Sequence, residues 1–358
     1  MTRPSGIAQS VTATAAGMAL LYFLRDILIP LVLALFLAVL VNALIRFIGA
    51  RLRGAPRWAV LVLAALVVII GAVVATLLFV QGAAQMVRQA PGLIARIEDI
   101  LQQTGREIGL SKPLNLAMLT GKISIPGVAG DVLGGVGGLV SGLLLMITYF
   151  IFILAGQAGM QRKLAKLSPS AGGTNSIEIV ARHIAGEFET YMWVQTVTGI
   201  MIAAGSALIM FAVGLDNVAF WTIVLFLLCY IPMLGVTVGS IVPALFALLQ
   251  FSSWWQAAVV FGGIQVIAFI VGNFIYPRMQ AESQNIAPVA TLLSLAFWGS
   301  LWGLTGAFLA VPLTLMVMMV CANFPRSRWV AVLLSNDGEP AFPEGATTAA
   351  TKRTPTPD

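Results

Sequence analysis

Long apolar runs, repeated along the whole chain, constrain its fold more than any other feature. A helix that spans a bilayer needs about 20 mainly apolar residues. Only 9% of the 358 residues are charged and 59% are hydrophobic, whereas roughly a quarter of residues are charged in soluble domains. The sequence therefore predicts an all-α, multi-pass membrane protein. The expected full spans are residues 8–24, 27–48, 58–80, 136–156, 191–214 and 254–276.

Basic residues in the short connections predict the orientation of these spans. Arg46, Arg51, Arg53 and Arg57 crowd the second connection without an acidic residue among them, and a second basic group lies in 157–190. Both connections are expected in the cytoplasm. This orientation places both termini in the cytoplasm as well.

The connection 81–135 is long and mildly polar, and we expect it on the extracytoplasmic side. Within it, apolar residues recur at helical spacing after Pro91, and proline suits a helix start. The predicted amphipathic helix is either a gate or cap, or an interfacial helix that only packs on the bundle. Residues 1–335 then form the membrane domain. The Thr- and Pro-rich stretch 336–358 is expected to be a disordered cytoplasmic tail.

Two further apolar runs are too long for one span, and the first is Val218–Gln250. As a single helix it would extend about 50 Å, although the hydrocarbon core is about 30 Å thick. Pro232, Gly235 and Gly239 fall near its middle. Irregular backbone at membrane depth requires surrounding protein or a water-filled cavity. We predict a re-entrant helical hairpin with its tip at Cys229–Val236, where Gly235 supplies a φ that other residues resist.

The second long run, Pro288–Phe324, has the same character. Gly299, Gly303 and Gly306 interrupt its middle, and Pro312 is expected to interrupt the returning limb. A second re-entrant hairpin is predicted here, which gives about six full spans plus two hairpins. The prolines assigned to hairpin breaks are Pro243, Pro277, Pro288 and Pro312.

The placement of charges favours hairpins over full crossings. If both runs re-enter, Asp216 lies outside, while Arg278, Arg326 and Arg328 lie inside. If both runs cross fully, Arg278 lies outside, against the positive-inside tendency.

Paired broken helices of opposite orientation are typical of transporter sites, because their ends present backbone polar groups to a solute. The candidate solute path consists of Gln195, Thr198, Pro232, Gly235, Gly239, Gln265, Asn273, Ser283, Asn285, Gly299, Gly303 and Gly306. For the polar members, interhelical hydrogen bonding is the alternative interpretation. Asp216 and Glu282 are candidates for a coupling-ion site, with an exposed loop residue and a solvated cytoplasmic acid as the alternatives.

The sequence lacks the residues that several classes of protein function require. No Walker motif or Ser-His arrangement is visible, and the single histidine, His183, cannot form a metal cluster alone. Cys229 and Cys321 both lie in apolar runs, which argues against disulfides and thiol metal sites. We therefore expect no enzyme activity, no cofactor and no metal. The net charge of +6 reflects membrane topology rather than nucleic-acid binding.

The two broken runs carry motifs that resemble a known family. "YIPMLGVTVGSIVPALFAL" and "NFIYPRMQAESQNIAPVATLLSLAFWGSLWGLTGAFLAVPLTL" are similar to the autoinducer-2 exporter family of bacterial membrane proteins, and the resemblance extends over nearly the whole chain. It implies a secondary exporter of a small polar solute in the bacterial cytoplasmic membrane, with autoinducer-2 as one candidate. It also implies a homo-oligomer. Proton-coupled cation (Na+/H+) exchange, linked to other members, is the alternative, and a non-transporting membrane scaffold is the alternative from another class.

The chain departs from the family pattern near the proposed site. Glu282 stands where a basic residue is common, and Ala287 where some members have histidine. Gln195 replaces a common lysine, and Met233 a frequent asparagine. These differences leave room for a solute other than autoinducer-2.

Overall fold

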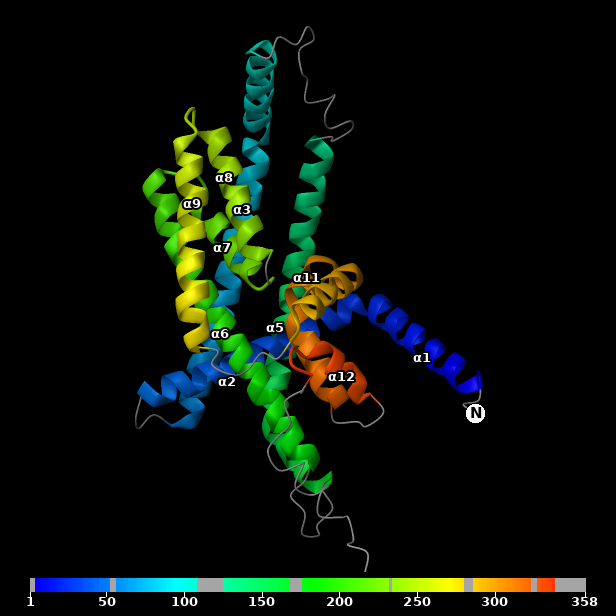
Figure 1. Ribbon diagram of the computed structural model, residues 1–358. Coiled ribbons are helices and arrows are strands. Elements are labelled where there is room, and N and C mark those ends of the chain that lie inside the picture. The colour runs from blue at the N-terminus through cyan, green and yellow to red at the C-terminus, as the bar shows by residue number, and fades with distance from the viewer. Residues whose placement is uncertain are drawn as a thin grey trace, which may run out of the picture. The chain divides into compact units, whose positions relative to one another are not determined.

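The computed structural model describes residues 4–51, 56–107, 125–167, 176–231, 234–279, 286–322 and 327–338, and every element in these ranges is a helix (Figure 1). The prediction of an all-α chain is confirmed. The helices are α1 (Pro4–Phe23), α2 (Arg25–Arg51), α3 (Arg57–Glu107), α5 (Ile125–Leu167), α6 (Ser176–Val213), α7 (Val218–Cys229), α8 (Gly235–Gln250), α9 (Trp255–Ile270), η1 (Val271–Ile275), α10 (Tyr276–Met279), α11 (Pro288–Ala322) and α12 (Arg328–Leu334).

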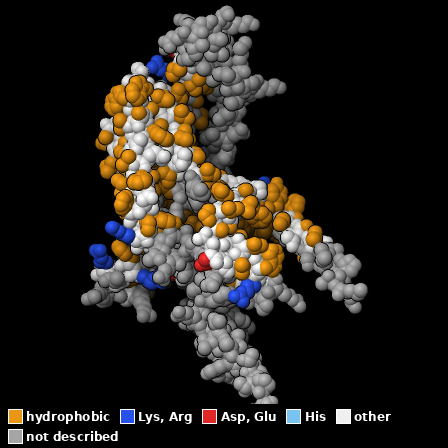
Figure 2. All heavy atoms as spheres, in the orientation of Figure 1, with side chains coloured by type: hydrophobic (Ala, Val, Ile, Leu, Met, Phe, Trp, Pro, Cys, Tyr) orange, Lys and Arg blue, Asp and Glu red, His pale blue; other side chains and the backbone are white. Residues whose placement is uncertain are grey.

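Six helical segments among the described residues are long and apolar enough to cross a membrane: α2, α3, α5, α6, the continuous stretch from α9 to α10, and α11. α7 and α8 are shorter apolar helices, and so is the stretch Val11–Phe23 of α1. Hydrophobic side chains cover much of the described surface in Figure 2. Such a surface is expected for helices that face lipid.

The chain divides into two compact units. The first unit comprises 1–68, 145–195 and 278–358, and in it α11 packs against α12, α1 and α2. The second comprises 69–144 and 196–277, and in it α8 packs closely against both α7 and α9. Four helices contribute to both units: α3, α5, α6 and the short α10.

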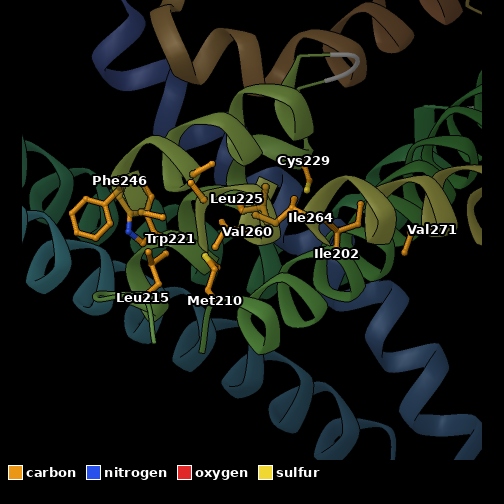
Figure 3. Close-up of a cluster of buried hydrophobic side chains, with 13 residues drawn as sticks. Ile202, Met210, Leu215, Trp221, Leu225, Cys229, Phe246, Val260, Ile264 and Val271 are labelled. Atoms are coloured by element: carbon orange, nitrogen blue, oxygen red, sulfur yellow. The ribbon is translucent and has the colours of Figure 1, made fainter. Parts of the chain in front are cut away.

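The core of the second unit is apolar and draws on α6, α7, α8 and α9. Trp221 packs on Phe246 with ring centroids 5.4 Å apart, and both lie in the cluster of buried side chains shown in Figure 3. Leu225, Val260 and Ile264 are almost completely buried in the same cluster. This core holds α7 and α8 against the longer helix α9.

The helix predicted to start at Pro91 does not exist as a separate element, and that prediction is wrong. α3 is continuous for 51 residues and contains Pro91. Met86 and Leu93, on either side of the proline, both pack against the core of the second unit. A proline inside a helix costs roughly 3 kcal/mol through one lost hydrogen bond and one steric clash. Packing on both sides of Pro91 offsets this local cost, so the helix continues.

α9 passes without a break through a π-helical turn, η1, into α10. The backbone N–H of Tyr276 donates to the carbonyl of Val271, five residues earlier. Within the turn, the Asn273 side-chain amide donates to the Phe269 carbonyl at 2.9 Å. One turn of wider helix therefore lies at the end of this span.

Candidate functional site

The run Val218–Gln250 folds into a helical hairpin made of α7 and α8. At its base, the backbone N–H of Asp216 donates to Gln250 Oε1 at 2.8 Å, and Gln250 Nε2 donates to the Gly214 carbonyl at 3.0 Å. The chain thus returns to its starting point after 34 residues. α7 has 12 residues and α8 has 16, so their lengths are about 18 and 24 Å. The predicted break in this run is confirmed.

Two glycines of α8 allow it to pack closely on α7. A Cβ on Gly235 would lie 1.7 Å from the Leu228 carbonyl oxygen, and one on Gly239 would lie 2.4 Å from Leu225 Cδ1. Gly235 is not among the glycines with a positive φ. The expected conformational reason for this glycine is therefore wrong. Glycine is needed at position 235 because the backbone of α8 lies directly against the backbone of α7 at Leu228, which leaves no room for a Cβ.

The end of α7 is also tied to α6. The hydroxyl groups of Tyr230 and Thr196 lie 2.6 Å apart and share a hydrogen bond. Both residues are buried. The hairpin is therefore hydrogen-bonded at its base through Gln250 and close to its tip through Tyr230.

The second long run also reverses direction, inside α11. Gly303 has φ 65° and ψ −143°, which is not helical. Trp298 Nε1 donates to Thr314 Oγ1 at 3.1 Å, although 16 residues would span about 24 Å in a straight helix. A Cβ on Gly306 would lie 1.8 Å from the Trp298 carbonyl oxygen. The two limbs of α11 are therefore in direct contact, and the predicted break at Gly303 is confirmed.

The prolines assigned to hairpin breaks are placed differently. Pro243 and Pro312 are buried inside continuous helical limbs, so their assignment to breaks is wrong. Pro277 lies within α10, directly after η1, and is not a break either. Pro288 is the first residue of α11. At this position a backbone N–H would have no partner within the helix, so proline costs no helical hydrogen bond. The reversals depend instead on the link between Cys229 and Gly235 and on Gly303.

An open groove of about 560 Å³ lies between α8 and α9, next to the start of α8. It is lined by Val236, Thr237, Gln265, Val266, Ala268 and Phe269. Ser240 is fully buried; its hydroxyl donates to the Thr237 carbonyl at 2.9 Å and lies 3.4 Å from Gln265 Oε1. The groove thus combines apolar walls with neutral hydrogen-bonding groups, and no charged side chain is among these lining residues.

Of the predicted path residues, the structure places Gln265 in this groove. Thr198 is buried in α6, Gln195 is half-buried in the same helix, and Asn273 is exposed in η1. None of these three lines the groove. The side chain of Asp216 is exposed at the hairpin base. Residues Pro232, Glu282, Ser283 and Asn285 lie outside the described part of the chain.

An ion pair in the first unit, in which only the carboxylate is buried, was not predicted from the sequence. Glu189 Oε1 lies 2.5 Å from Arg46 Nη2; the Glu189 side chain is 11% exposed and that of Arg46 is 66% exposed. Glu189 lies well inside α6, which begins at Ser176. A carboxylate inside a span needs a partner, and the neighbouring arginine cluster is the sequence signal that could have identified it.

Comparison with known proteins agrees with the resemblance seen in the motifs. The sequence model described as AI-2E family transporter matches residues 12–326. The AI-2 transport protein TqsA of Escherichia coli (strain K12) is 26% identical over 323 residues, which cover 88% of this chain and 91% of TqsA. A provisionally named transport protein of Haemophilus influenzae is 27% identical over 330 residues, 87% of this chain and 90% of its own length. The predicted family resemblance is confirmed.

Proposed function

The chain belongs to the AI-2E family of transporters, and on that premise we propose that it exports a small, uncharged, hydrogen-bonding solute by secondary transport. The observation that carries this proposal is the groove between α8 and α9, in which Thr237 and Gln265 stand among apolar residues. A solute without charge can bind there without leaving an unpaired ion in an apolar environment. Gln265 can both donate and accept hydrogen bonds, which suits a hydroxyl-bearing molecule.

Autoinducer-2 is the first solute to test, because the relative TqsA is named for its transport. The experiment measures efflux from proteoliposomes loaded with autoinducer-2, with other small neutral solutes, and with an anion and a cation of similar size. We expect efflux of one or more neutral solutes above that of protein-free vesicles. Efflux that is no faster than in protein-free vesicles for every solute contradicts the proposed function.

Gln265→Leu tests the location of the solute site. Loss of one to two hydrogen bonds, each worth about 1 kcal/mol, should slow efflux of the preferred solute roughly tenfold. Gln85→Leu is the matched control, because Gln85 is an exposed glutamine on α3. An equal loss of efflux in both variants would mean that the groove is not the solute site.

We also propose that each of the two hairpins enters and leaves the membrane on one side. The limbs α7 and α8 are about 18 and 24 Å long, shorter than the hydrocarbon core of about 30 Å, and Gln250 joins their outer ends. In a chain without Cys229 and Cys321, cysteines at Asp216 and Ser252 should both react with a membrane-impermeant maleimide from outside. Both positions are exposed. Reaction of Ser252→Cys from the cytoplasmic side alone would mean a full crossing.

Cation exchange gains no comparable support. The groove-lining residues carry no charge, and within the described residues no group of three or more His, Cys, Asp or Glu side chains could hold a metal ion. A neutral solute is therefore the preferred reading of this groove.

A further inference from the structure

The short helix α12 is fixed to the base of the second hairpin. The backbone N–H of Ala287 donates to the Leu334 carbonyl at 2.9 Å, which joins the end of α12 to the start of α11. Ser327 Oγ donates to the Cys321 carbonyl at 3.1 Å, which joins its start to the end of α11. Ala331 is completely buried, and α12 packs on α11. The helix is held at both ends and along one side.

The opposite side of α12 carries large apolar side chains that nothing in the described chain covers. Trp329 is 64% exposed, Leu333 69% and Val332 39%. Positions 329, 332 and 333 lie on one face of a helix, because residues three and four apart are neighbours. Arg328 is exposed beside Trp329, and the chain turns polar directly afterwards at Ser335, Asn336 and Asp337. A face of this kind in water would normally be polar.

We propose that α12 is an interfacial membrane anchor that binds the surface of an anionic phospholipid leaflet. Trp329, Val332 and Leu333 enter the boundary between headgroups and acyl chains, and the Arg328 guanidinium reaches the phosphate groups. Tryptophan is enriched at this depth of the bilayer, and arginine can keep its charge in the headgroup layer while its stem lies against apolar surface. Each basic side chain near an anionic leaflet contributes about 1 kcal/mol.

The position and size of the face favour lipid over a second protein. α11, one of the helices apolar enough to span a membrane, ends at Ala322, and α12 starts only a few residues later, at Arg328. α12 therefore lies close to where the chain leaves the hydrocarbon core. The helix has seven residues and is about 10 Å long. Its outer face is too small for a stable protein interface, which buries about 800 Å² per partner.

The consequence concerns the second hairpin. Since both ends of α11 are bonded to α12, lipid that holds α12 also fixes the depth of the hairpin base. Movement of the hairpin then has to occur at its tip, around Gly303.

The test measures the depth of a nitroxide spin label at Leu333, with a label at Asn336 for comparison, in a chain without Cys229 and Cys321. The protein is reconstituted in vesicles of phosphatidylcholine and phosphatidylglycerol, an anionic lipid whose surface charge attracts basic segments. The collision rates of each label with oxygen and with nickel ethylenediaminediacetate give its depth. We expect the Leu333 label to favour oxygen and the Asn336 label to favour the nickel complex.

Two results would overturn the anchor. Equal nickel accessibility at both positions would place the α12 face in water, and shielding of the Leu333 label from both reagents would mean that protein covers it. The headgroup contact has its own readout: vesicles without phosphatidylglycerol should make the Leu333 label shallower in the parent chain, and Arg328→Gln should remove that lipid dependence. If the depth of the Leu333 label in the parent chain is the same with and without phosphatidylglycerol, the proposed role of Arg328 is refuted. Arg96→Gln, on α3, is the control for a general loss of positive charge.

Discussion

Gly235→Ala tests whether close backbone contact, rather than backbone conformation, requires glycine at the tip of the first hairpin. The new Cβ would lie 1.7 Å from the Leu228 carbonyl oxygen, while ordinary contact begins at 3.4 Å. The limbs must therefore separate by about 1.7 Å to restore ordinary contact. Overpacking in a core costs about 1–3 kcal/mol. The Leu228 carbonyl oxygen belongs to the backbone and cannot rotate away as a side chain can. We therefore expect a loss of unfolding free energy at the upper end of this range, about 3 kcal/mol.

Two glycine variants in the same unit serve as controls for Gly235→Ala. Gly262 has no atom within 4 Å of its added Cβ, so Gly262→Ala should change stability by less than about 1 kcal/mol. The Cβ added by Gly239→Ala would meet the flexible end of the Leu225 side chain. Its loss of stability should therefore lie between those of Gly235→Ala and Gly262→Ala. Unfolding by SDS in mixed micelles, followed by tryptophan fluorescence, gives the three free energies. Equal stability of Gly235→Ala and Gly262→Ala would refute the contact argument.

Three further predictions concern the hydrogen bonds and the turn that hold the hairpins. Gly303→Ala places a side chain at φ 65°, ψ −143°, a backbone region open almost only to glycine. It should lower the free energy of unfolding by about 1–3 kcal/mol in the same SDS titration. An unchanged SDS midpoint contradicts this. Tyr230→Phe and Thr196→Val should show a coupling energy of about 1 kcal/mol in a double-mutant cycle, whereas strictly additive losses would mean that their 2.6 Å bond contributes nothing. Gln250→Leu removes both bonds at the hairpin base and should accelerate hydrogen exchange at the Asp216 amide, while Gln250→Glu, which keeps the acceptor, should retain most of its protection.

The helix breaks could be predicted from sequence because length and glycine content act locally. An apolar run such as Val218–Gln250 is too long for one span, and the structure divides it between Cys229 and Gly235. The physical role of each interrupting residue was harder to predict. Pro312 was expected to break a helix that in fact continues, because neighbouring helices and side chains can satisfy the backbone groups that a proline frees in a membrane helix.

Contacts between distant segments could not be predicted from the sequence. The continuity of α3 through Pro91 depends on the packing of Met86 and Leu93 against the core of the second unit, which no local pattern reveals. The pairing of Glu189 with Arg46 likewise needs α2 and α6 to meet. Gln265 was identified because a polar residue inside an apolar span is conspicuous, but its groove partner Thr237 gave no signal of that kind.

The π-helical turn η1 has a consequence for how this chain tolerates insertions and deletions. A π turn holds one residue more than an α turn over the same rise. Deleting one residue from Val271–Ile275 would let the segment close as an ordinary α-helix without breaking the span. Everything after it, including Pro277 and Arg278, would then keep its present direction around the helix axis, because one full turn of either helix ends at the same angle. A single-codon deletion here would therefore preserve both the membrane span and the direction in which the chain leaves it, whereas the same deletion in an α-helical stretch would rotate everything after it by about 100°.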